Sequence, residues 1–273
     1  MPDPRFAASR RWPVRSAAVL LLAPAILASC RSLEPAAAPA GTAFLPAITP
    51  YPQTEAFPRR ARVVPWWQER FDACNAQAAA GGFDILFIGD SITQGWGTEG
   101  REVWEKEIAP LGAANFGFSG DRTENVLWRL DHGNLEGRIA PRAVVVMIGT
   151  NNTGHGMDLP EEIAQGVSAI VGRLTDRLPR ARVLLLGIFP RGEKPDDPMR
   201  VNNAAANALI ARLDGAGGGR VKFLDLGPRF LAPDGALPQE IMPDRLHLSP
   251  RGYAIWAEAI LPELRAILAS PGR

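Results

Sequence analysis

The sequence predicts an α/β domain with a mostly parallel, five-stranded sheet. From about Pro65 onward, short apolar and β-branched runs alternate with longer amphipathic stretches, which is the pattern of β-α units. Each short run is almost wholly apolar, as strands covered on both faces should be. Gly, Ser, Asn or Asp residues follow several of these runs directly. Together these observations predict a sheet whose strand ends carry a polar site.

The predicted elements alternate along the chain. The strands are expected at residues 84–88 (DILFI), 113–116 (AANF), 142–148 (RAVVVMI), 182–188 (RVLLLGI) and 221–225 (VKFLD). The helices are expected at residues 65–79, 100–109, 122–131, 160–178, 198–214 and 250–269. Ser249-Pro250 begins the last helix well, because serine is a good N-cap and proline suits the first helical position. These elements form one domain, which we place at residues 63–273.

The amino terminus has the layout of an export signal. Four arginines precede residue 16, and residues 17–28 form an apolar run that is too short to cross a bilayer. The run ends in Leu27-Ala28-Ser29-Cys30, which resembles a bacterial lipoprotein box, where cleavage leaves the cysteine as an acylated first residue. We therefore expect a lipoprotein-type signal peptide at 1–29, lipid attachment at Cys30 and export to the cell envelope. Ser9-Arg10-Arg11 leaves the twin-arginine route open beside the general one.

Residues 30–62 are rich in Pro and Ala and have no apolar period, so they are expected to tether the domain to the membrane anchor. The whole chain is 46% hydrophobic with a net charge of +1, and only three of its 30 basic residues are lysines. This composition is ordinary for a globular protein and does not predict a nucleic-acid partner. The two cysteines lie outside any Cys/His cluster, so neither a metal nor another cofactor is expected.

Polar groups suited to acyl transfer follow four of the predicted strands. Ser91 follows the first strand, Gly120 the second and Asn151 the third, whereas Asp244 and His247 come after the fifth. Because the carboxyl ends of parallel strands meet at one edge of a sheet, we expect these residues to lie close together. The Asp-x-x-His spacing places the carboxylate and the imidazole on the same turn. The set contains the parts required for acyl transfer to a serine.

Each of these groups has an expected role. Ser91 is the candidate nucleophile, His247 the base that takes its proton, and Asp244 the carboxylate that orients the imidazole. The backbone N–H groups of Ser91 and Gly120 and the side-chain amide of Asn151 are the candidate oxyanion hole, which stabilises the tetrahedral intermediate.

Other chemistries have weaker sequence signals. Gly95-x-Gly97-x-x-Gly100 spells a dinucleotide-binding motif, but it begins seven residues past the first predicted strand instead of at its end. The Walker A ending G-K-[ST] is absent, and so is the G-x-S-x-G motif of α/β-hydrolases.

Four blocks of the sequence resemble the signature blocks of the SGNH, or GDSL, hydrolase family. They read GDSITQGW, NFGFSGD, GTNN and DRLH and occur in the family order. The longer runs NFGFSGDRTENVLWRL, VVVMIGTNN and FPRGEKPDDP are similar to the catalytic subunits of platelet-activating-factor acetylhydrolase IB and their bacterial relatives. The resemblance covers about residues 83–268. It implies a three-layer, flavodoxin-like α/β/α sandwich and assigns the same triad and oxyanion residues.

The resemblance leaves the substrate open, because the family hydrolyses acetyl groups on lipids and sugars, longer lipid esters and thioesters. Arg122 stands where the mammalian enzymes carry a small polar residue, so we expect it to reshape the mouth of the pocket. Trp96 and Asn152 are the other candidate substrate-binding residues. For Trp96 the alternative is a place in the core, and for Asn152 it is a solvent-facing turn.

We expect a serine esterase that hydrolyses short-chain, above all acetyl, esters of carbohydrates or other substrates accessible at the envelope. The predicted connections between strands and helices contain no insertion long enough to form a lid over a long acyl chain. A lysophospholipase or thioesterase using the same triad is the alternative enzyme, and an envelope lipoprotein that only binds a ligand is the non-catalytic alternative. The sequence leaves the oligomeric state open.

Overall fold

A computed structural model describes Pro50 and residues 64–270 of the chain. The predicted signal peptide at 1–29, the predicted lipid attachment at Cys30 and, apart from Pro50, the predicted tether at 30–62 lie outside the described residues. Within the described segment, no helix combines the length and the apolar composition needed to cross a membrane.

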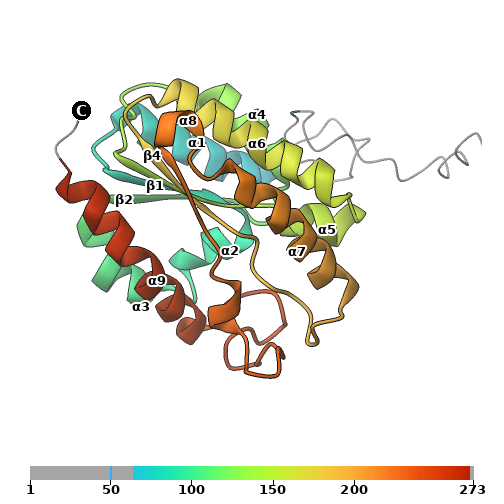
Figure 1. Ribbon diagram of the computed structural model, residues 1–273. Coiled ribbons are helices and arrows are strands. Elements are labelled where there is room, and N and C mark those ends of the chain that lie inside the picture. Colours follow the sequence, from blue (N-terminus) through green and yellow to red (C-terminus); the bar gives the residue numbers. More distant parts are fainter. Residues whose placement is uncertain (1–49, 51–63, 271–273) are drawn as a thin grey trace, which may run out of the picture. The chain divides into compact units, whose positions relative to one another are not determined.

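The described domain is built on one sheet of five parallel strands, as the sequence predicts (Figure 1). The strands are β1 (Ile85–Gly89), β2 (Ala113–Gly117), β3 (Ala143–Met147), β4 (Arg182–Leu186) and β5 (Val221–Leu224). Their order is β2-β1-β3-β4-β5, the flavodoxin-like arrangement with a switch point between β1 and β3. Gly89 pairs with Gly117 and with Met147, so β1, β2 and β3 reach this point in register.

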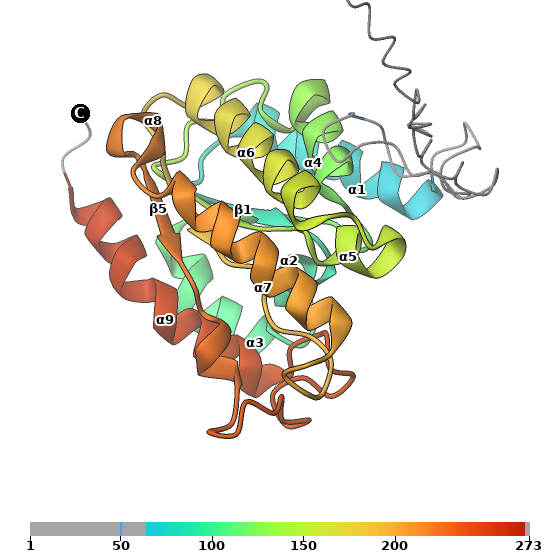
Figure 2. The same cartoon turned by 45° about the vertical axis from the view of Figure 1, so that its right-hand side comes forward.

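Helices cover both faces of the sheet and complete the predicted three layers (Figures 1 and 2). One face is covered by α1 (Pro65–Ala80), α4 (Thr123–Arg129), α6 (Pro160–Arg177) and α7 (Pro198–Ile210). The other is covered by α2 (Ser91–Gln94), α3 (Arg101–Val103) and α9 (Pro250–Ala269). Of two further short helices, α5 (Thr150–Gly156) follows β3, and α8 (Ala216–Gly219) precedes β5. Short 3-10 and π turns occupy residues 95–97, 104–108, 109–111, 130–134, 211–213 and 227–230.

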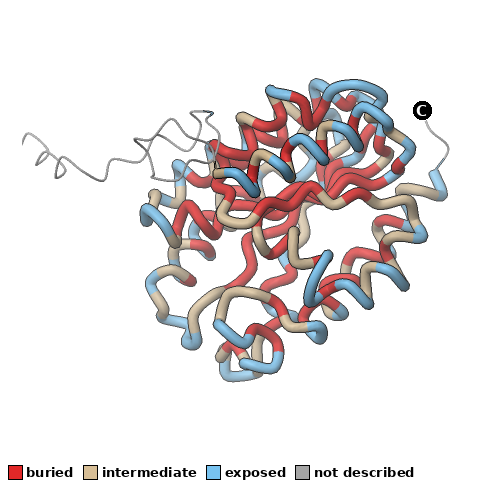
Figure 3. Tube along the Cα trace, turned by 180° about the vertical axis from the view of Figure 1, so that it is seen from behind, coloured by how far each residue is buried: buried red, intermediate tan, exposed pale blue. Residues whose placement is uncertain are grey.

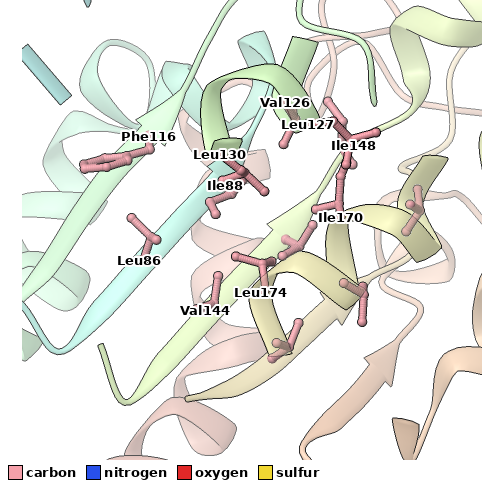
Figure 4. Close-up of a cluster of buried hydrophobic side chains, with 14 of the residues drawn as sticks. Leu86, Ile88, Phe116, Val126, Leu127, Leu130, Val144, Ile148, Ile170 and Leu174 are labelled. Carbon is pink, nitrogen blue, oxygen red and sulfur yellow. The ribbon is translucent and has the colours of Figure 1, made fainter. Parts of the chain in front are cut away.

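Each face of the sheet has its own apolar core, because successive strand residues point to opposite sides. Leu86 and Ile88 of β1 belong to the apolar cluster that also contains Leu127 of α4 and Leu174 of α6 (Figure 4). The opposite face is aromatic, with Phe87 of β1 packed against side chains of α9 and the turn after α2. Figure 3 shows the buried centre of the sheet, where β1 and β3 are buried along their whole length. The edge strands β2 and β5 are only partly buried.

The helices differ from the prediction where they are short or broken. The expected helix at 100–109 consists of α3, a π turn at Trp104–Ile108 and a 3-10 turn at Ala109–Leu111, where proline removes a backbone donor. The sequence pattern did not predict α2 and α5, because one or two helical turns are too short to show a period. The start of α9 is as expected, since the hydroxyl of Ser249 accepts a hydrogen bond from the N–H of Gly252 at 3.2 Å.

Candidate active site

Ser91 lies at the sharp turn between β1 and α2. Gly89 ends the strand so close to α2 that a Cβ at this position would lie 2.1 Å from Oγ1 of Thr93. Asp90 then caps the helix, because its Oδ1 accepts a hydrogen bond from the N–H of Ile92 at 2.9 Å. Ser91 is therefore the first residue of α2, a position whose N–H has no acceptor within the helix.

Asp90 is buried beside the candidate nucleophile without facing solvent. Burial raises its pKa to about 7, although the backbone N–H of Ile92 and the nearby His247 act in the opposite direction. Its Oδ2 has no hydrogen-bond partner among the described residues. Asp90 is thus a structural cap of α2 and holds the turn that presents Ser91.

The three candidate triad residues form one hydrogen-bonded path. Oγ of Ser91 is 2.9 Å from Nε2 of His247, and Nδ1 of His247 is 2.6 Å from Oδ2 of Asp244. A carboxylate accepts only, so Nδ1 donates to Asp244 and Nε2 is left to accept the proton of Ser91. The path runs across 156 residues of sequence, from the end of β1 to the segment before α9.

Asp244 is held in place by the turn that it shares with His247. Its Oδ1 accepts hydrogen bonds from the backbone N–H groups of Leu246 at 3.0 Å and His247 at 2.7 Å. Partial burial would raise the pKa of Asp244, but the hydrogen bonds from the His247 ring and from these two N–H groups outweigh it and lower the pKa. The carboxylate is therefore ionised where it orients the imidazole.

The candidate oxyanion donors surround the same strand ends. Gly120 follows β2 with a φ of +77°, in the left-handed region that glycine favours. Asn151, the second residue of α5, donates one Nδ2 hydrogen to the carbonyl of Asp121 at 2.9 Å and keeps the other. Within the described part of the chain, the N–H groups of Ser91 and Gly120 donate no hydrogen bond. Three donors are thus available near Ser91.

A buried charge network lies beneath these donors. Asp121 accepts hydrogen bonds from Nε of Arg129 at 2.8 Å and from Nε1 of Trp67 at 2.7 Å. Arg129 also donates to the carbonyl of Gly89 at 3.1 Å, which ties the loop after β2 to the end of β1. Burial raises the pKa of Asp121 to about 6, although Arg129 and Trp67 act in the opposite direction.

Two of the predicted substrate-binding residues are buried instead of lining the pocket. The guanidinium of Arg122 lies 2.5 Å from Glu124 and 2.6 Å from Asp158. Asn152 accepts from the N–H of Thr123 at 3.0 Å and donates to Asp158 at 2.9 Å. The expectation that Arg122 shapes the pocket mouth is wrong, because two carboxylates hold its charge inside. Asn152 neither faces solvent nor lines the pocket, since it joins the same network.

Trp96 is also buried and forms part of the aromatic core. Its ring centroid lies 4.9 Å from that of Trp256 and 4.7 Å from that of Tyr253, both on α9. The expectation that Trp96 flanks the active-site cleft is therefore wrong. The 3-10 turn after α2 directs the side chain under the sheet, although Ser91 is only five residues away in sequence.

The loop after β4 and helix α7 hold the segment that carries His247. Arg245 has a φ of +61°, and its carbonyl accepts a hydrogen bond from Gly192 at 2.9 Å. The buried Arg200 of α7 in turn donates to the carbonyls of Arg191 at 2.9 Å and Gly192 at 2.6 Å. The loop after β4 thus links α7 to the histidine segment.

Sequence reasoning missed Trp67, Arg129 and Arg200 as supports of the site. For Arg129 a signal was present, because the residue lies in the otherwise mostly apolar run NVLWRL. Arginine is almost never buried unless it is paired, so an arginine in an apolar helical run indicates a carboxylate partner nearby. The sequence did not show which carboxylate that is.

Comparison with known proteins shows the family of the chain. Residues 87–255 match the GDSL-like lipase/acylhydrolase family. The chain is 43% identical over 186 residues to human platelet-activating factor acetylhydrolase IB subunit alpha1, covering 68% of this chain and 77% of that protein. It is also 43% identical over 171 residues to the mouse subunit alpha2, covering 63% and 71% of the two chains.

Solved structures share the fold at lower sequence identity. A GDSL-like lipase from Bacteroides thetaiotaomicron is 20% identical with a TM-score of 0.58, covering 72% of this chain and 97% of that one. An acetylxylan esterase from Geobacillus stearothermophilus is 21% identical with a TM-score of 0.53, covering 67% and 94%. The segment matched to the family runs from β1 into α9 and includes the candidate triad and the candidate oxyanion residues. The chain belongs to the GDSL-like lipase/acylhydrolase family and is an ester-cleaving hydrolase.

Proposed function

We propose that this chain is a serine esterase that removes short acyl groups, above all acetyl, from carbohydrates or other esters accessible at the cell envelope. The observation that carries the proposal is the hydrogen-bonded path from Asp244 through His247 to Ser91. Such a path provides a nucleophile, its base and the group that orients the base. It supports transfer of the acyl group to serine followed by hydrolysis.

In the first half-reaction, Oγ of Ser91 attacks the ester carbonyl carbon while its proton passes to Nε2 of His247. The carbonyl electron pair moves onto oxygen, and the N–H groups of Ser91 and Gly120 and the amide of Asn151 stabilise the resulting anion. Asp244 stabilises the imidazolium. When the intermediate collapses, the bond to the alcohol oxygen breaks, and that oxygen takes the proton from Nε2 and leaves as the alcohol.

In the second half-reaction, water replaces the alcohol. Nε2 of His247 takes a proton from the water, whose oxygen attacks the carbonyl carbon of the acyl-Ser91 ester. The same donors stabilise the second tetrahedral anion. Its collapse breaks the bond to Oγ, which takes the proton back from Nε2 and releases the carboxylic acid.

Short connections around Ser91 support a short acyl group. After β1, β2 and β3 the chain enters α2, α4 and α5 within six residues, and none of these three connections is long enough to cover an extended acyl chain. The longer segment 231–249 carries Asp244 and His247. The similar human and mouse proteins are named acetylhydrolases, which supports acetyl as the group removed. The acetylxylan esterase of similar fold makes acetylated sugars a reasonable first class of substrate.

A phospholipid-like ester is the second candidate substrate. The 43% identity to platelet-activating factor acetylhydrolase subunits favours it. A lysophospholipase or thioesterase would use the same triad, so activity on lysolipid micelles compared with acetylated xylan separates the two classes. Higher activity on the micelles would replace the carbohydrate proposal.

Export and lipid attachment complete the proposal. They are supported by the arginines and the apolar run within residues 1–29 and by the position of Cys30 after Ala28-Ser29. When the full chain is expressed in bacteria with radioactive palmitate, wild type should be labelled and Cys30→Ser should not. Labelling of both proteins, or of neither, would contradict attachment at Cys30.

The central experiment measures hydrolysis of p-nitrophenyl acetate and p-nitrophenyl octanoate by the full chain. We expect turnover of the acetate to exceed that of the octanoate, and Ser91→Ala to be inactive on both while its circular dichroism matches wild type. A preference for the octanoate would refute the short-acyl proposal. Equal activity of wild type and Ser91→Ala would remove Ser91 as the nucleophile.

A further inference from the structure

A polar cleft of about 480 Å³ lies beside the edge strand β2, separate from the groups assigned to the chemistry. One stripe of α1 forms most of its wall, and Gln94 of α2 and Asn115 of β2 complete it. The α1 stripe consists of Trp66, Glu69, Arg70, Ala73, Cys74 and Gln77. The volume falls within the range of small-molecule sites in proteins.

The lining of this cleft combines a flat apolar surface with neutral polar groups. The indole of Trp66 is 42% exposed. The carboxamides of Gln77 and Gln94 each carry donors and an acceptor. Glu69 and Arg70 carry opposite charges, so the lining selects for neither an anion nor a cation. This combination suits a sugar ring, which has an apolar C–H face and a rim of hydroxyl groups.

A peptide strand is the competing occupant, because an edge strand offers free backbone groups. Arg70 occupies two backbone carbonyls of β2. Its Nε donates to the carbonyl of Gly117 at 2.6 Å, and its Nη2 donates to the carbonyl of Asn115 at 3.2 Å. Strand addition at this edge would have to break both bonds, so the structure disfavours a peptide.

The cleft adjoins the candidate oxyanion hole through Gln94. This residue ends the single-turn helix that Ser91 begins, so the two residues lie about one helical turn apart. Oε1 of Gln94 accepts a hydrogen bond at 2.7 Å from the N–H of Ser119, the residue before Gly120. A ligand in the cleft would therefore lie next to the loop that provides the oxyanion donors.

We propose that this cleft binds a sugar unit adjacent to the one whose acetyl ester is cleaved at Ser91. The proposal rests on the esterase function proposed above and narrows its substrate to acetylated oligosaccharides. Trp66 stacks on the apolar face of the bound sugar, and Gln77 and Gln94 bind its hydroxyl groups.

The kinetic test compares two substrates of the full chain. Trp66→Ala should lower kcat/KM for acetylated xylotetraose about tenfold, chiefly through KM, because an aromatic contact is lost. The same variant should leave p-nitrophenyl acetate hydrolysis unchanged, since that substrate does not reach the cleft. Val201→Ala, at a 53% exposed apolar residue of α7, is the matched control and should change neither. Equal losses on both substrates in Trp66→Ala, or no loss on the oligosaccharide, would overturn the proposal.

A binding measurement separates failure of the cleft from failure of the esterase. Calorimetry of the full-length Ser91→Ala protein with xylotetraose, cellotetraose and chitotetraose should detect binding of at least one, and Trp66→Ala in the same background should abolish it. If none binds, the cleft proposal is overturned even when wild type hydrolyses p-nitrophenyl acetate. If wild type fails on that ester while Trp66-dependent binding is present, the esterase proposal fails and the sugar site stands.

Discussion

The candidate active site has two halves of different construction. The nucleophile half consists of Ser91, Gly120 and Asn151, which follow β1, β2 and β3 and lie above a buried ion pair. The histidine half consists of Asp244 and His247, whose side chains are 55% and 44% exposed. These two residues lie in the segment 231–249, which contains neither helix nor strand and runs into α9 (Figure 1).

The contrast shows two ways of fixing a catalytic group. Strand register and short helical turns fix the nucleophile half, so its geometry forms together with the core. The histidine half depends on hydrogen bonds between loops, such as the one from Gly192 to the carbonyl of Arg245. Substitutions in the nucleophile half should therefore affect stability and catalysis together more often than substitutions in the histidine half.

The largest effect is expected when either half loses its reacting group. Ser91→Ala and His247→Ala should each lower kcat by about 10⁴-fold or more, and the double variant should be no worse than the worse single variant, because the two groups act as a unit. Steady-state kinetics measures this, with thermal unfolding as the check on folding. A double-variant loss equal to the product of the two single losses would show that the halves act independently.

The next largest effect concerns the histidine half alone. Asp244→Asn should lower kcat by about 10³- to 10⁴-fold, because an amide donor facing Nδ1 favours the tautomer that cannot accept the proton of Ser91. The side chain is more than half exposed, so the free energy of unfolding should change by less than about 1 kcal/mol. Kinetics and urea unfolding of the same preparation measure both. A large loss of stability in Asp244→Asn would contradict the view that the histidine half contributes to catalysis without contributing much to stability.

Stability should respond most strongly beneath the nucleophile half. Arg129→Met leaves the buried carboxylate of Asp121 without its cationic partner and should lower the free energy of unfolding by about 3 to 5 kcal/mol. Arg251→Met removes an exposed partner of Glu240 and should cost less than about 1 kcal/mol. Urea unfolding of the two variants provides the comparison. Similar losses in both would show that burial of the ion pair does not determine its contribution.

Asn151→Ala tests the chemistry of the nucleophile half. It should lower kcat by about 100- to 1000-fold with little change in KM, because the amide stabilises the oxyanion more than the bound ester. Asn152→Ala is the neighbouring control, since that amide bonds Asp158 inside the protein, and it should reduce stability more than kcat. A loss confined to KM in Asn151→Ala would contradict the oxyanion role.

The last effect expected is a change in how stability depends on pH. The pKa of Asp90 is raised from 3.8 to about 7, so the folded chain binds more protons than the unfolded chain between these values, and stability from this group falls as pH rises through them. The pKa of Asp244 is lowered, so its contribution is complete above the unfolded value and is lost only as the solution becomes more acidic. With rising pH, the contribution of Asp90 to stability therefore falls and that of Asp244 rises.

Urea midpoints between pH 5 and 8 measure this difference. Asp90→Asn keeps an oxygen to cap α2 but cannot ionise, so its stability should decline less with rising pH than that of wild type. Asp244→Asn should keep the wild-type slope over the same range. Identical slopes in wild type and Asp90→Asn would mean that Asp90 does not titrate in this range in the folded protein.

Much of the fold was predictable because its strands are buried on both faces. All five strands lie within two residues of their expected bounds, since continuous apolar runs admit few other interpretations. The proximity of Ser91 and His247 was also predictable, because parallel strands deliver their carboxyl ends to one edge. The short helices α2 and α5 were not predictable, because they are too short to show the apolar period of a helix. Their bounds depend on caps and on the ends of the preceding strands.

By itself, the sequence determined the order of strands and helices and which polar residues reach the active-site edge, because those properties follow from local pattern and from the handedness of β-α connections. The tertiary structure alone decided which of the neighbouring residues are available to a substrate. Trp96 is buried because α9, far along the chain, packs over it, and Arg122 is buried because Asp158 lies beside it. Burial depends on contacts with elements that are distant in sequence, and the local sequence pattern does not predict which elements will be in contact.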